Sequence, residues 1–355
     1  MNRRAYIDWL RGIAVVAMIE WHVMDSWSLR DGRGGWDWHL FGLVGGAASP
    51  LFLFLAGLSV PLAIAAYERR GATRAAAAWR VQKRGWQVFL LAHVFRFISF
   101  FFNVHAKWAG LLRPDILNIL GLGLAFTAWL AKRATDAAGR VQWLLVPALI
   151  IVVLTPFAKT WWWPTLLNPR LEAYIRPVGN MGVFTLFPWV ALVPIGAYVG
   201  SLLLSSRDEP RTLQRFALAG AALYAVSWVG GDAATRAGAG FWVGPAAEIA
   251  FRAGWILMAL GAAWLIVRAL PAAMSEPLLV LGRTSLFVYF AHVELAYGVF
   301  SYPLHGALPV RWSLTGFALV TVAMYFAGRW WDSRPPGPWI PAWLRADGRT
   351  LVHRP

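Results

Sequence analysis

The sequence of 355 residues contains no cysteine, so disulfide bonds, thiolate catalysis and cysteine-ligated metal centres are excluded. Charged residues are also scarce, because Asp, Glu, Lys and Arg together make up only 14% of the chain. Soluble domains usually carry about 25%. No phosphate-binding loop, dinucleotide fingerprint or HExxH-type spacing occurs, and the seven histidines are scattered along the chain. We therefore expect neither a soluble nucleotide-binding enzyme nor a metal centre.

Hydrophobic residues are abundant instead, at 59% of the chain and a mean hydropathy of +0.53. They form apolar runs of about 20 residues, the length of helix that crosses a bilayer. The pattern predicts an all-α, polytopic transmembrane helix bundle over residues 1–332 and a Pro-rich cytoplasmic tail over residues 333–355. About ten spans are predicted, at residues 6–27, 40–66, 84–102, 114–131, 141–158, 184–204, 215–231, 247–268, 280–301 and 313–330. The polar stretch 159–183 predicts an external loop with one short amphipathic turn.

Basic residues outnumber acidic residues by 33 to 17, which gives the chain a net charge of +16. If the N-terminus is cytoplasmic and the spans alternate, 22 Lys and Arg fall inside, nine fall outside and two remain within spans. This distribution follows the positive-inside rule and predicts that both termini are cytoplasmic. The expected partner of the basic excess is therefore a bilayer with anionic lipids, and not nucleic acid.

The first predicted span keeps several ionisable side chains at membrane depth, where each charge is costly. At about 100° per residue, Asp8, Arg11, His22 and Asp25 share one face of this helix, and Glu20 points to the opposite side. A lone intramembrane histidine commonly makes only a hydrogen bond between helices. The charged neighbours of His22 indicate instead that this face lines a polar cavity.

The ninth span contains a second polar pair, His292 and Glu294, among aromatic residues. Such a pair needs partners within the bundle, and the first span, with Glu20 and His22, is the expected neighbour. Two interpretations stay open for this pair. It is either a structural clamp between helices or a protonatable centre in which one group is the base and another tunes it.

Three further polar side chains lie within predicted spans. Arg96 and Arg252 cannot reach a surface in this topology, so each predicts either an ion pair, with Glu20 or Glu248, or a site for an anionic substrate. Asn118 lies one turn into the fourth span, where its amide needs a partner in the bundle.

Basic and aromatic residues gather in two of the connections. Arg80, Lys83 and Arg84 lie on one helical turn before the third span, and they suit either the phosphates of a nucleotide-like cofactor or a simple inside-positive signal. Trp36 and Trp38 in an external connection suit either stacking on sugar rings or an interfacial belt.

The segment RGIAVVAMIEWH, with ten residues between Arg11 and His22, resembles the signature of the acyltransferase-3 family of transmembrane acyltransferases. A closer resemblance is to bacterial relatives of heparan-α-glucosaminide N-acetyltransferase. It is carried, in chain order, by DWLRGIAVVAMIEWH, SPLFLFLAGLS, RPDILNILGLG, FPWVALVPIGAYVG and LGRTSLFVYFAHVELAYG. These segments are spread between residues 8 and 298, and the long middle loop and the tail lie outside them.

The resemblance implies a protein of the bacterial cytoplasmic membrane that moves an acetyl or other acyl group from cytoplasmic acyl-CoA. The acceptor would be a hydroxyl or amine of a sugar, glycan or glycolipid on the external side. His22 matches the catalytic histidine of acyltransferase-3 proteins, and Arg11 matches the arginine of the same motif. In lysosomal members the catalytic histidine lies later, in the loop before the second span, so His39 is the second choice.

The polar residues within the predicted spans and the resemblance together predict roles along the chain, with Asp25 or Glu294 expected to orient the His22 ring. The predicted catalytic residues are His22, Asp25, Glu20, His39, His292 and Glu294, those for acetyl-CoA are Arg11, Asp8, Arg80, Lys83, Arg84 and Arg283, and those for the acceptor are Asn118, Arg96, Arg252, Trp36 and Trp38. No metal is expected. Direct transfer and an acetyl-histidine intermediate both stay open, as do the identity of the acceptor and a homo-oligomeric state. The alternative function is a proton-coupled transporter or channel that uses the same intramembrane charges.

Overall fold

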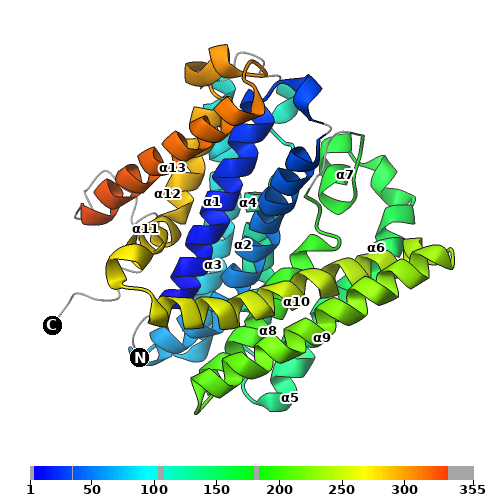
Figure 1. Cartoon of the computed structure of the whole chain (residues 1–355). Helices are drawn as coiled ribbons and strands as arrows, with labels where there is room; N and C mark the ends of the chain where they lie inside the picture. The colour runs from blue at the N-terminus through cyan, green and yellow to red at the C-terminus, as the bar shows by residue number, and fades with distance from the viewer. Residues whose placement is uncertain (1–3, 34, 103–107, 180–183, 335–355) are drawn as a thin grey trace. The chain divides into compact units, whose positions relative to one another are not determined.

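The computed structural model describes residues 4–33, 35–102, 108–179 and 184–334, and these residues form helices and their connections (Figure 1). The α-helices are α1 (Ala5–Trp27), α2 (Trp36–Glu68), α3 (Arg74–Phe102), α4 (Ile116–Ala131), α5 (Ala137–Arg140), α6 (Val146–Thr160), α7 (Pro169–Ile175), α8 (Leu192–Ser205), α9 (Glu209–Arg236), α10 (Gly240–Ala269), α11 (Ala272–Arg283), α12 (Ser285–Tyr297) and α13 (Val310–Ser333). Short 3-10 helices are η1 (Arg30–Gly32), η2 (Trp108–Gly110), η4 (Trp163–Leu166), η5 (Trp189–Ala191) and η6 (Val299–Leu304), and η3 (Val141–Leu145) is a π-helical turn between α5 and α6. The all-α class predicted from the sequence is therefore confirmed.

The chain divides into two compact units that are interleaved in the sequence. Unit 1 consists of Met1–Leu51, Phe95–Trp108 and Ala263–Pro355, and unit 2 consists of Phe52–Val94 and Ala109–Ala262. Helices α2, α3 and α10 each contain residues of both units. The predicted tail lies outside the described residues from position 335 onward.

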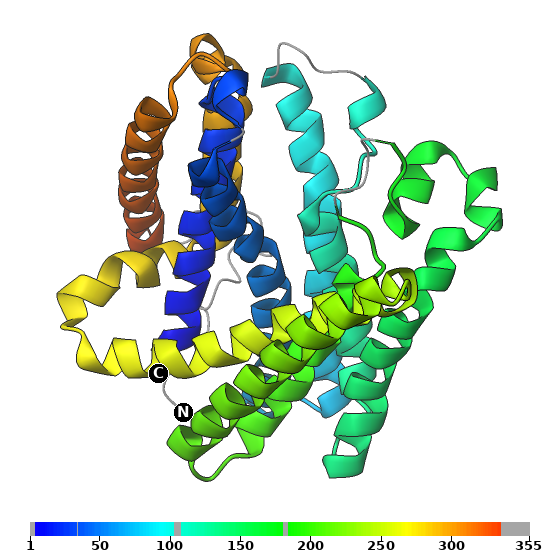
Figure 2. The same ribbon diagram turned by 45° about the vertical axis from the view of Figure 1, so that its right-hand side comes forward.

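In unit 1 the helix α1 packs against α11, α12 and α13 (Figures 1 and 2). Two glycines allow the approach of α1 to α11 to be close. A methyl group on Gly12 of α1 would overlap the backbone of Leu278 in α11, and one on Gly282 of α11 would overlap the backbone of Asp8. Small residues at a helix crossing bring two backbones together, which is the usual packing of helices in membranes.

The predicted ninth span is not one straight helix. It consists of α11 and α12, which are bent by 80° at Thr284, where the backbone leaves helical geometry with φ −102° and ψ 15°. The close contacts of Gly12 and Gly282 place α11 across the first half of α1. Helix α12 runs beside the second half, because the carbonyl oxygen of Ala296 accepts hydrogen bonds from Ser26 Oγ at 2.6 Å and from Trp27 Nε1 at 3.0 Å.

The end of α1 is further held by backbone hydrogen bonds to the connection between η6 and α13. The N–H groups of Gly306 and Leu308 donate to the carbonyl oxygens of Ser26 and Trp27 at 2.8 and 2.9 Å, and Leu29 N–H donates back to Leu308 at 2.9 Å. These bonds fix the direction in which the chain leaves α1. They lie at the end of the helix that carries His22 and Asp25.

Unit 2 has its own apolar core, formed by small and branched residues of α2, α3, α4, η3 and α8 such as Ile64, Ala78, Leu144 and Ala197. The polar stretch 159–183 contains η4 and the seven-residue helix α7, in agreement with the predicted loop and short amphipathic turn. The third predicted span begins earlier than expected. Its helix starts at Arg74, because the preceding alanine-rich sequence continues the helix that was predicted to begin at residue 84.

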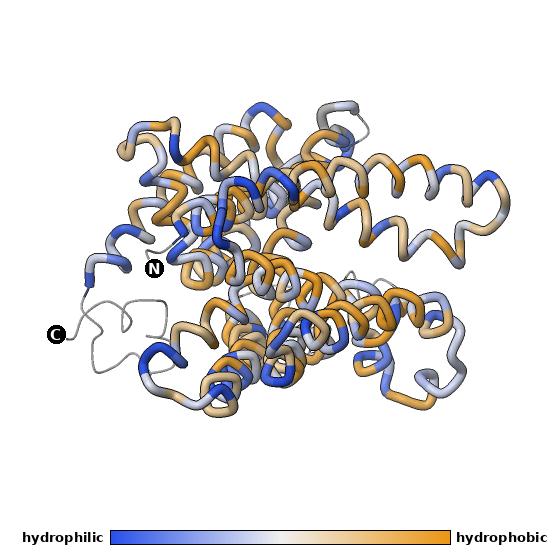
Figure 3. The backbone as a smooth tube through the Cα atoms, turned by 90° about the horizontal axis from the view of Figure 1, so that it is seen from below, coloured by the Kyte–Doolittle hydropathy of each residue, from blue (hydrophilic) through white to orange (hydrophobic). Residues whose placement is uncertain are grey.

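Six helices within the described ranges are long and apolar enough to cross a membrane, or seven if α11 and α12 count as one bent span. Long hydrophobic stretches along the helices are visible in Figure 3. Helix α1 has 23 residues but contains Asp8, Arg11, Glu20 and Asp25, and α4 and η5–α8 are shorter apolar helices. The helical bundle is therefore confirmed, whereas the number of ten spans stays a prediction.

Candidate functional site

Two histidines from distant parts of the sequence meet in unit 1. The Nδ1 atom of His22, on α1, lies 2.9 Å from Nε2 of His292, on α12. Their rings are nearly parallel, with centroids 5.1 Å apart and an angle of 10° between the planes. The expectation that the first span is a neighbour of the ninth span is borne out by this contact between their histidines, although 270 positions separate the two residues.

His292 is the inner member of this pair. Its side chain has 0% exposure, and its Nδ1 atom lies 2.6 Å from the carbonyl oxygen of Val288, one turn earlier on α12. The ring of Tyr289 contacts it edge-on with centroids 6.0 Å apart. His22 is only half-buried, and no hydrogen bond to its Nε2 atom occurs within the part of the chain that the structure describes. The outer ring of the pair therefore presents an unoccupied nitrogen.

Asp25 lies one turn after His22 and binds other groups. Its carboxylate accepts a hydrogen bond of 2.8 Å from the hydroxyl of Tyr297 and one of 3.4 Å from Arg33 Nη1. The expectation that Asp25 itself orients the His22 ring is thus not met, because Tyr297 and Arg33 take up its oxygens and His292 occupies the His22 Nδ1 atom. Tyr297 connects Asp25 to this ring, because its own ring contacts that of His22 edge-on with centroids 5.5 Å apart.

Arg33 ties this site to an aromatic pair. It donates to the carbonyl oxygens of Asp25 and Ser28 at 2.6 and 3.2 Å, and its guanidinium lies 5.0 Å from the ring centroid of Trp38. Trp38 in turn contacts Trp21, with centroids 6.0 Å apart. The predicted acceptor residue Trp38 therefore adjoins the site through Arg33.

Two predicted residues of the same connection lie at the surface of unit 1. Trp36 is 80% exposed, and His39 is also exposed. His39 was expected in a loop, but α2 begins at Trp36 and places it in the first turn of that helix. Unlike His22, His39 does not pair with a second histidine among the described residues, and its catalytic role stays a prediction.

The two glutamates of the predicted catalytic set do not contact either histidine. Glu20 points away from His22, as the helical periodicity predicts, and is buried at 4% exposure without a hydrogen-bond partner for either oxygen among the residues described. Glu294 accepts a hydrogen bond from Ser99 of α3. The expectation that Glu294 orients the His22 ring is not met. Glu294 lies two positions after His292 on α12, so the helical periodicity places it on a different face from His292.

The first half of α1 carries an ion pair between two of the predicted donor-binding residues. Arg11 Nη1 lies 3.1 Å from Asp8 Oδ1, one turn earlier, and Asp8 is buried at 4% exposure. Both were predicted to bind the donor. They lie eleven positions or more before His22, which corresponds to roughly 16 Å along the helix axis for Arg11.

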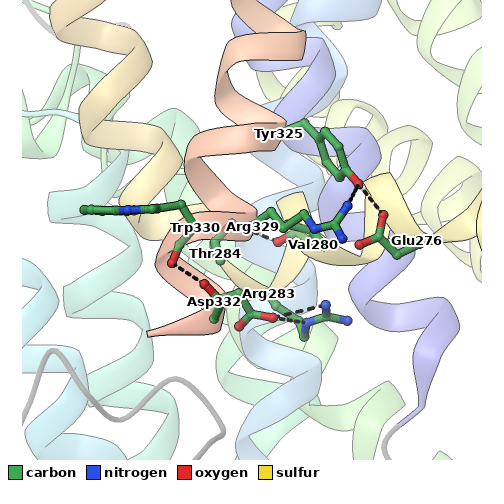
Figure 4. A network of polar contacts seen from close by, with 9 residues as sticks. Glu276, Val280, Arg283, Thr284, Tyr325, Arg329, Trp330 and Asp332 are labelled. Carbon is green, nitrogen blue, oxygen red and sulfur yellow. Dashed lines mark hydrogen bonds and ion pairs between the residues drawn. The ribbon is translucent and has the colours of Figure 1, made fainter. Parts of the chain in front are cut away.

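Arg283, a further predicted donor residue, belongs to a polar network between α11 and α13 (Figure 4). It contacts Asp332 Oδ2 through Nη2 at 3.2 Å and Nε at 3.3 Å. In the same network the Tyr325 hydroxyl donates to Glu276 at 2.6 Å and accepts from Arg329 at 3.3 Å. These bonds close α13 against α11, and the donor-binding role of Arg283 stays a prediction.

The basic cluster before the third span lies on α3, in unit 2. Arg80 and Lys83 are exposed and Arg84 is half-buried, so the turn presents at least two cationic side chains to the surroundings. The Arg80 guanidinium also lies 5.1 Å from the ring centroid of Tyr67. The cluster was expected on one helical turn of the connection before the third span, and the earlier start of α3 makes that turn part of the long helix.

The remaining predicted polar residues have neighbours in their own units. In unit 2, Asn118 accepts from the backbone N–H of Asp115 at 2.9 Å in a helix-capping box and lies 3.3 Å from His93 Nε2. The ion pair predicted for Arg252 is present, with Glu248 at 2.8 Å. Arg96, in unit 1, is half-buried on α3. The substrate-binding roles of these residues stay predictions.

The sequence analysis missed Tyr297, Arg33 and Val288. The signal for Arg33 was misleading, because its position fitted an external basic residue in the charge count. Tyr297 is one of several aromatic residues in its span, and the Val288 contribution is a backbone oxygen that carries no residue-type signal. No cluster of three or more potential metal ligands occurs in residues 4–33, 35–102, 108–179 and 184–334.

A helical bundle with several membrane-length apolar helices, and with a histidine pair of which one member is buried, defines an integral membrane protein with a protonatable site. Comparison with protein-family models gives the particular family. Residues 3–233, more than half of the chain, match the family described as heparan-alpha-glucosaminide N-acetyltransferase, catalytic, and the chain therefore belongs to this family of membrane acetyltransferases. A search of the curated proteins finds no match. The resemblance to the acyltransferase-3 family stays a prediction.

Proposed function

We propose that this protein transfers an acetyl group from cytoplasmic acetyl-CoA to a sugar hydroxyl or amine on the opposite side of the membrane, with His22 as the reactive residue. The observation that carries the proposal is the His22–His292 pair at 2.9 Å, in which one histidine is buried and supports the other. Membership of the acetyltransferase family supports the reaction class.

The open Nε2 atom of His22 serves either route of acyl transfer. In direct transfer it takes the proton of the acceptor hydroxyl or amine while the acceptor oxygen or nitrogen attacks the thioester carbonyl. The carbon–sulfur bond then breaks, and the imidazolium returns the proton to the CoA thiolate. In the two-step route, Nε2 attacks the thioester carbonyl and the carbon–sulfur bond breaks, which gives an acetyl-imidazolium and the CoA thiolate. The acceptor then attacks the acetyl carbon, the bond to Nε2 breaks to release neutral imidazole, and the acceptor proton balances the thiolate charge. Both routes need a lone pair on the same nitrogen.

Cationic side chains are the proposed contacts of the donor phosphates. Arginine binds phosphate through paired, charge-assisted hydrogen bonds. Arg11 is available for this role only in company with Asp8, because the two form an ion pair. Arg80 and Lys83 are exposed on α3, and neither pairs with a carboxylate within the described residues, so they keep their predicted role in phosphate binding.

For the acceptor we propose the aromatic and charged group at the end of α1. Trp38 offers an aromatic face, and the guanidinium of Arg33 and the carboxylate of Asp25 offer donors and acceptors for ring hydroxyls. This group adjoins His22 through Tyr297. An amino sugar or glycan end would therefore present its nucleophile beside the His22 ring.

The test uses purified full-length protein in lipid nanodiscs with acetyl-CoA and amino-sugar or glycan acceptors. Because the chain lacks cysteine, a thiol reagent reports only the CoA that is released. We expect His22→Ala to abolish acetyl-CoA-dependent thiol release, with a loss of at least ~100-fold, the usual scale for a positioned general base.

A matched control is His93→Ala in unit 2, where the histidine lies 3.3 Å from the Asn118 amide and 3.5 Å from the Tyr174 hydroxyl. This variant is expected to keep kcat close to that of the wild type. Equal loss in both variants would argue against a specific role of His22. Solute transport by a protein that neither binds acetyl-CoA nor releases CoA would support the transporter instead.

A further inference from the structure

We propose that His292 is a positioning residue that selects which nitrogen of His22 reacts, by fixing the tautomer of the His22 ring. The inference rests on the proposed acetyl transfer and goes beyond it, because it states which of the four ring nitrogens carry a hydrogen and which do not. It also extends the functional residues past position 233, where the family match ends.

The backbone oxygen of Val288 determines which nitrogen of His292 carries a hydrogen. A carbonyl oxygen can only accept a hydrogen bond, so the His292 Nδ1 atom at 2.6 Å must carry a hydrogen. In a neutral His292 ring the other nitrogen, Nε2, is then a pure acceptor. This ring is the fully buried one, and no carboxylate forms a hydrogen bond with it within the described residues, so its surroundings favour the neutral form.

The position of the hydrogen on His292 also determines the tautomer of the His22 ring. Since His292 Nε2 accepts, His22 Nδ1 at 2.9 Å must be the donor. A neutral His22 ring then holds its only lone pair on Nε2, the nitrogen that has no hydrogen bond in the described part of the chain. Val288, His292 and His22 thus form a directed chain in which both N–H groups point inward and the basic nitrogen points outward.

Histidine pairs of this kind differ from a histidine held by a carboxylate. A carboxylate would both fix the tautomer and stabilise the charged ring, whereas a neutral imidazole fixes the tautomer with little charge stabilisation. His292 cannot itself be the base in this arrangement, because one of its nitrogens carries a hydrogen and the other is occupied by His22. Its effect is therefore on the fraction of His22 that is ready to react.

Two variants separate this role from simple packing. His292→Leu fills the space but offers no acceptor, and His292→Gln restores an oxygen acceptor for the His22 N–H. We expect His292→Leu to lower kcat by ~100-fold without changing KM for acetyl-CoA, and His292→Gln to recover at least tenfold of that loss, within the usual range for groups that act in proton transfer.

A second measurement does not depend on activity. In wild-type protein labelled with ¹⁵N-histidine, solid-state NMR in nanodiscs should show His22 as the Nδ1–H tautomer, with the signal assigned by its loss in His22→Gln. In His292→Leu the Nε2–H tautomer should appear. The proposal is overturned if wild-type His22 is the Nε2–H tautomer, or if His292→Leu and His292→Gln lower kcat equally. If the wild type transfers no acetyl group, the proposed function fails, and the NMR result still decides the tautomer. If His292→Leu does not fold, the wild-type spectrum and His292→Gln decide.

Discussion

The two ends of α1 both carry charged residues in an otherwise apolar helix, and they use them in different ways. At the first half, Asp8 and Arg11 bind each other at 3.1 Å, and Gly12 brings the helix into close contact with α11. At the second half, His22 keeps one nitrogen without a hydrogen bond in the described structure, although its other nitrogen is held at 2.9 Å.

In this comparison the first half of α1 holds the helix in place, and the second half carries the proposed reactive group. A buried polar group without a partner is costly, so polar groups that serve only the fold are paired. A reactive group must leave one atom unpaired, and the cost is acceptable where the surroundings are half-open. His22 meets this description, and the Asp8–Arg11 pair does not.

The sharpest test of the comparison at the reactive end is Asp25→Asn. The variant keeps one acceptor oxygen, replaces the other carboxylate oxygen with an amide NH2 group, and removes the negative charge that would stabilise a His22 imidazolium in the proposed transition state. We expect kcat to fall about 10-fold, which corresponds to about 1.4 kcal/mol in the barrier. Tyr297→Phe should lower kcat by a similar or smaller factor. Steady-state kinetics with acetyl-CoA check both, and unchanged kcat in both variants would remove this network from the mechanism.

A second prediction concerns the anchoring end. Gly12→Ala would place a methyl group on the backbone of Leu278 and force α1 and α11 apart, so we expect a loss of about 1–3 kcal/mol in stability. The measurement is the melting temperature in detergent. Gly46→Ala is the matched control, because a methyl group there meets nothing within 4 Å and alanine favours the helix. Equal melting temperatures for the two variants would contradict the close crossing.

The smallest expected effect separates the two roles of Arg283. As a structural partner of Asp332, partly exposed, it should contribute about 0–1 kcal/mol to stability, and Arg283→Gln and Asp332→Asn should lower the melting temperature alike. As a donor-binding residue, Arg283→Gln alone should raise KM for acetyl-CoA. A KM that is unchanged in Arg283→Gln would limit this residue to packing.

The sequence predicted much of the fold because apolar length and helical periodicity are local properties. The helical class, the opposite directions of His22 and Glu20, and the Arg252–Glu248 pair all follow from spacing along one helix. The break at Thr284 was not predicted, because α11 and α12 form a continuous apolar pattern and the 80° bend depends on how each half packs on α1.

The sequence by itself determined that ionisable groups lie in membrane-length helices, because their composition and periodicity are readable from the chain alone. Only the tertiary structure decided how they pair. It gave Asp25 to Tyr297 and Arg33, Glu294 to Ser99, and His22 to His292. The reason is that a side chain bonds to whichever group lies nearest in space, and for His22 that group is 270 positions away in the sequence.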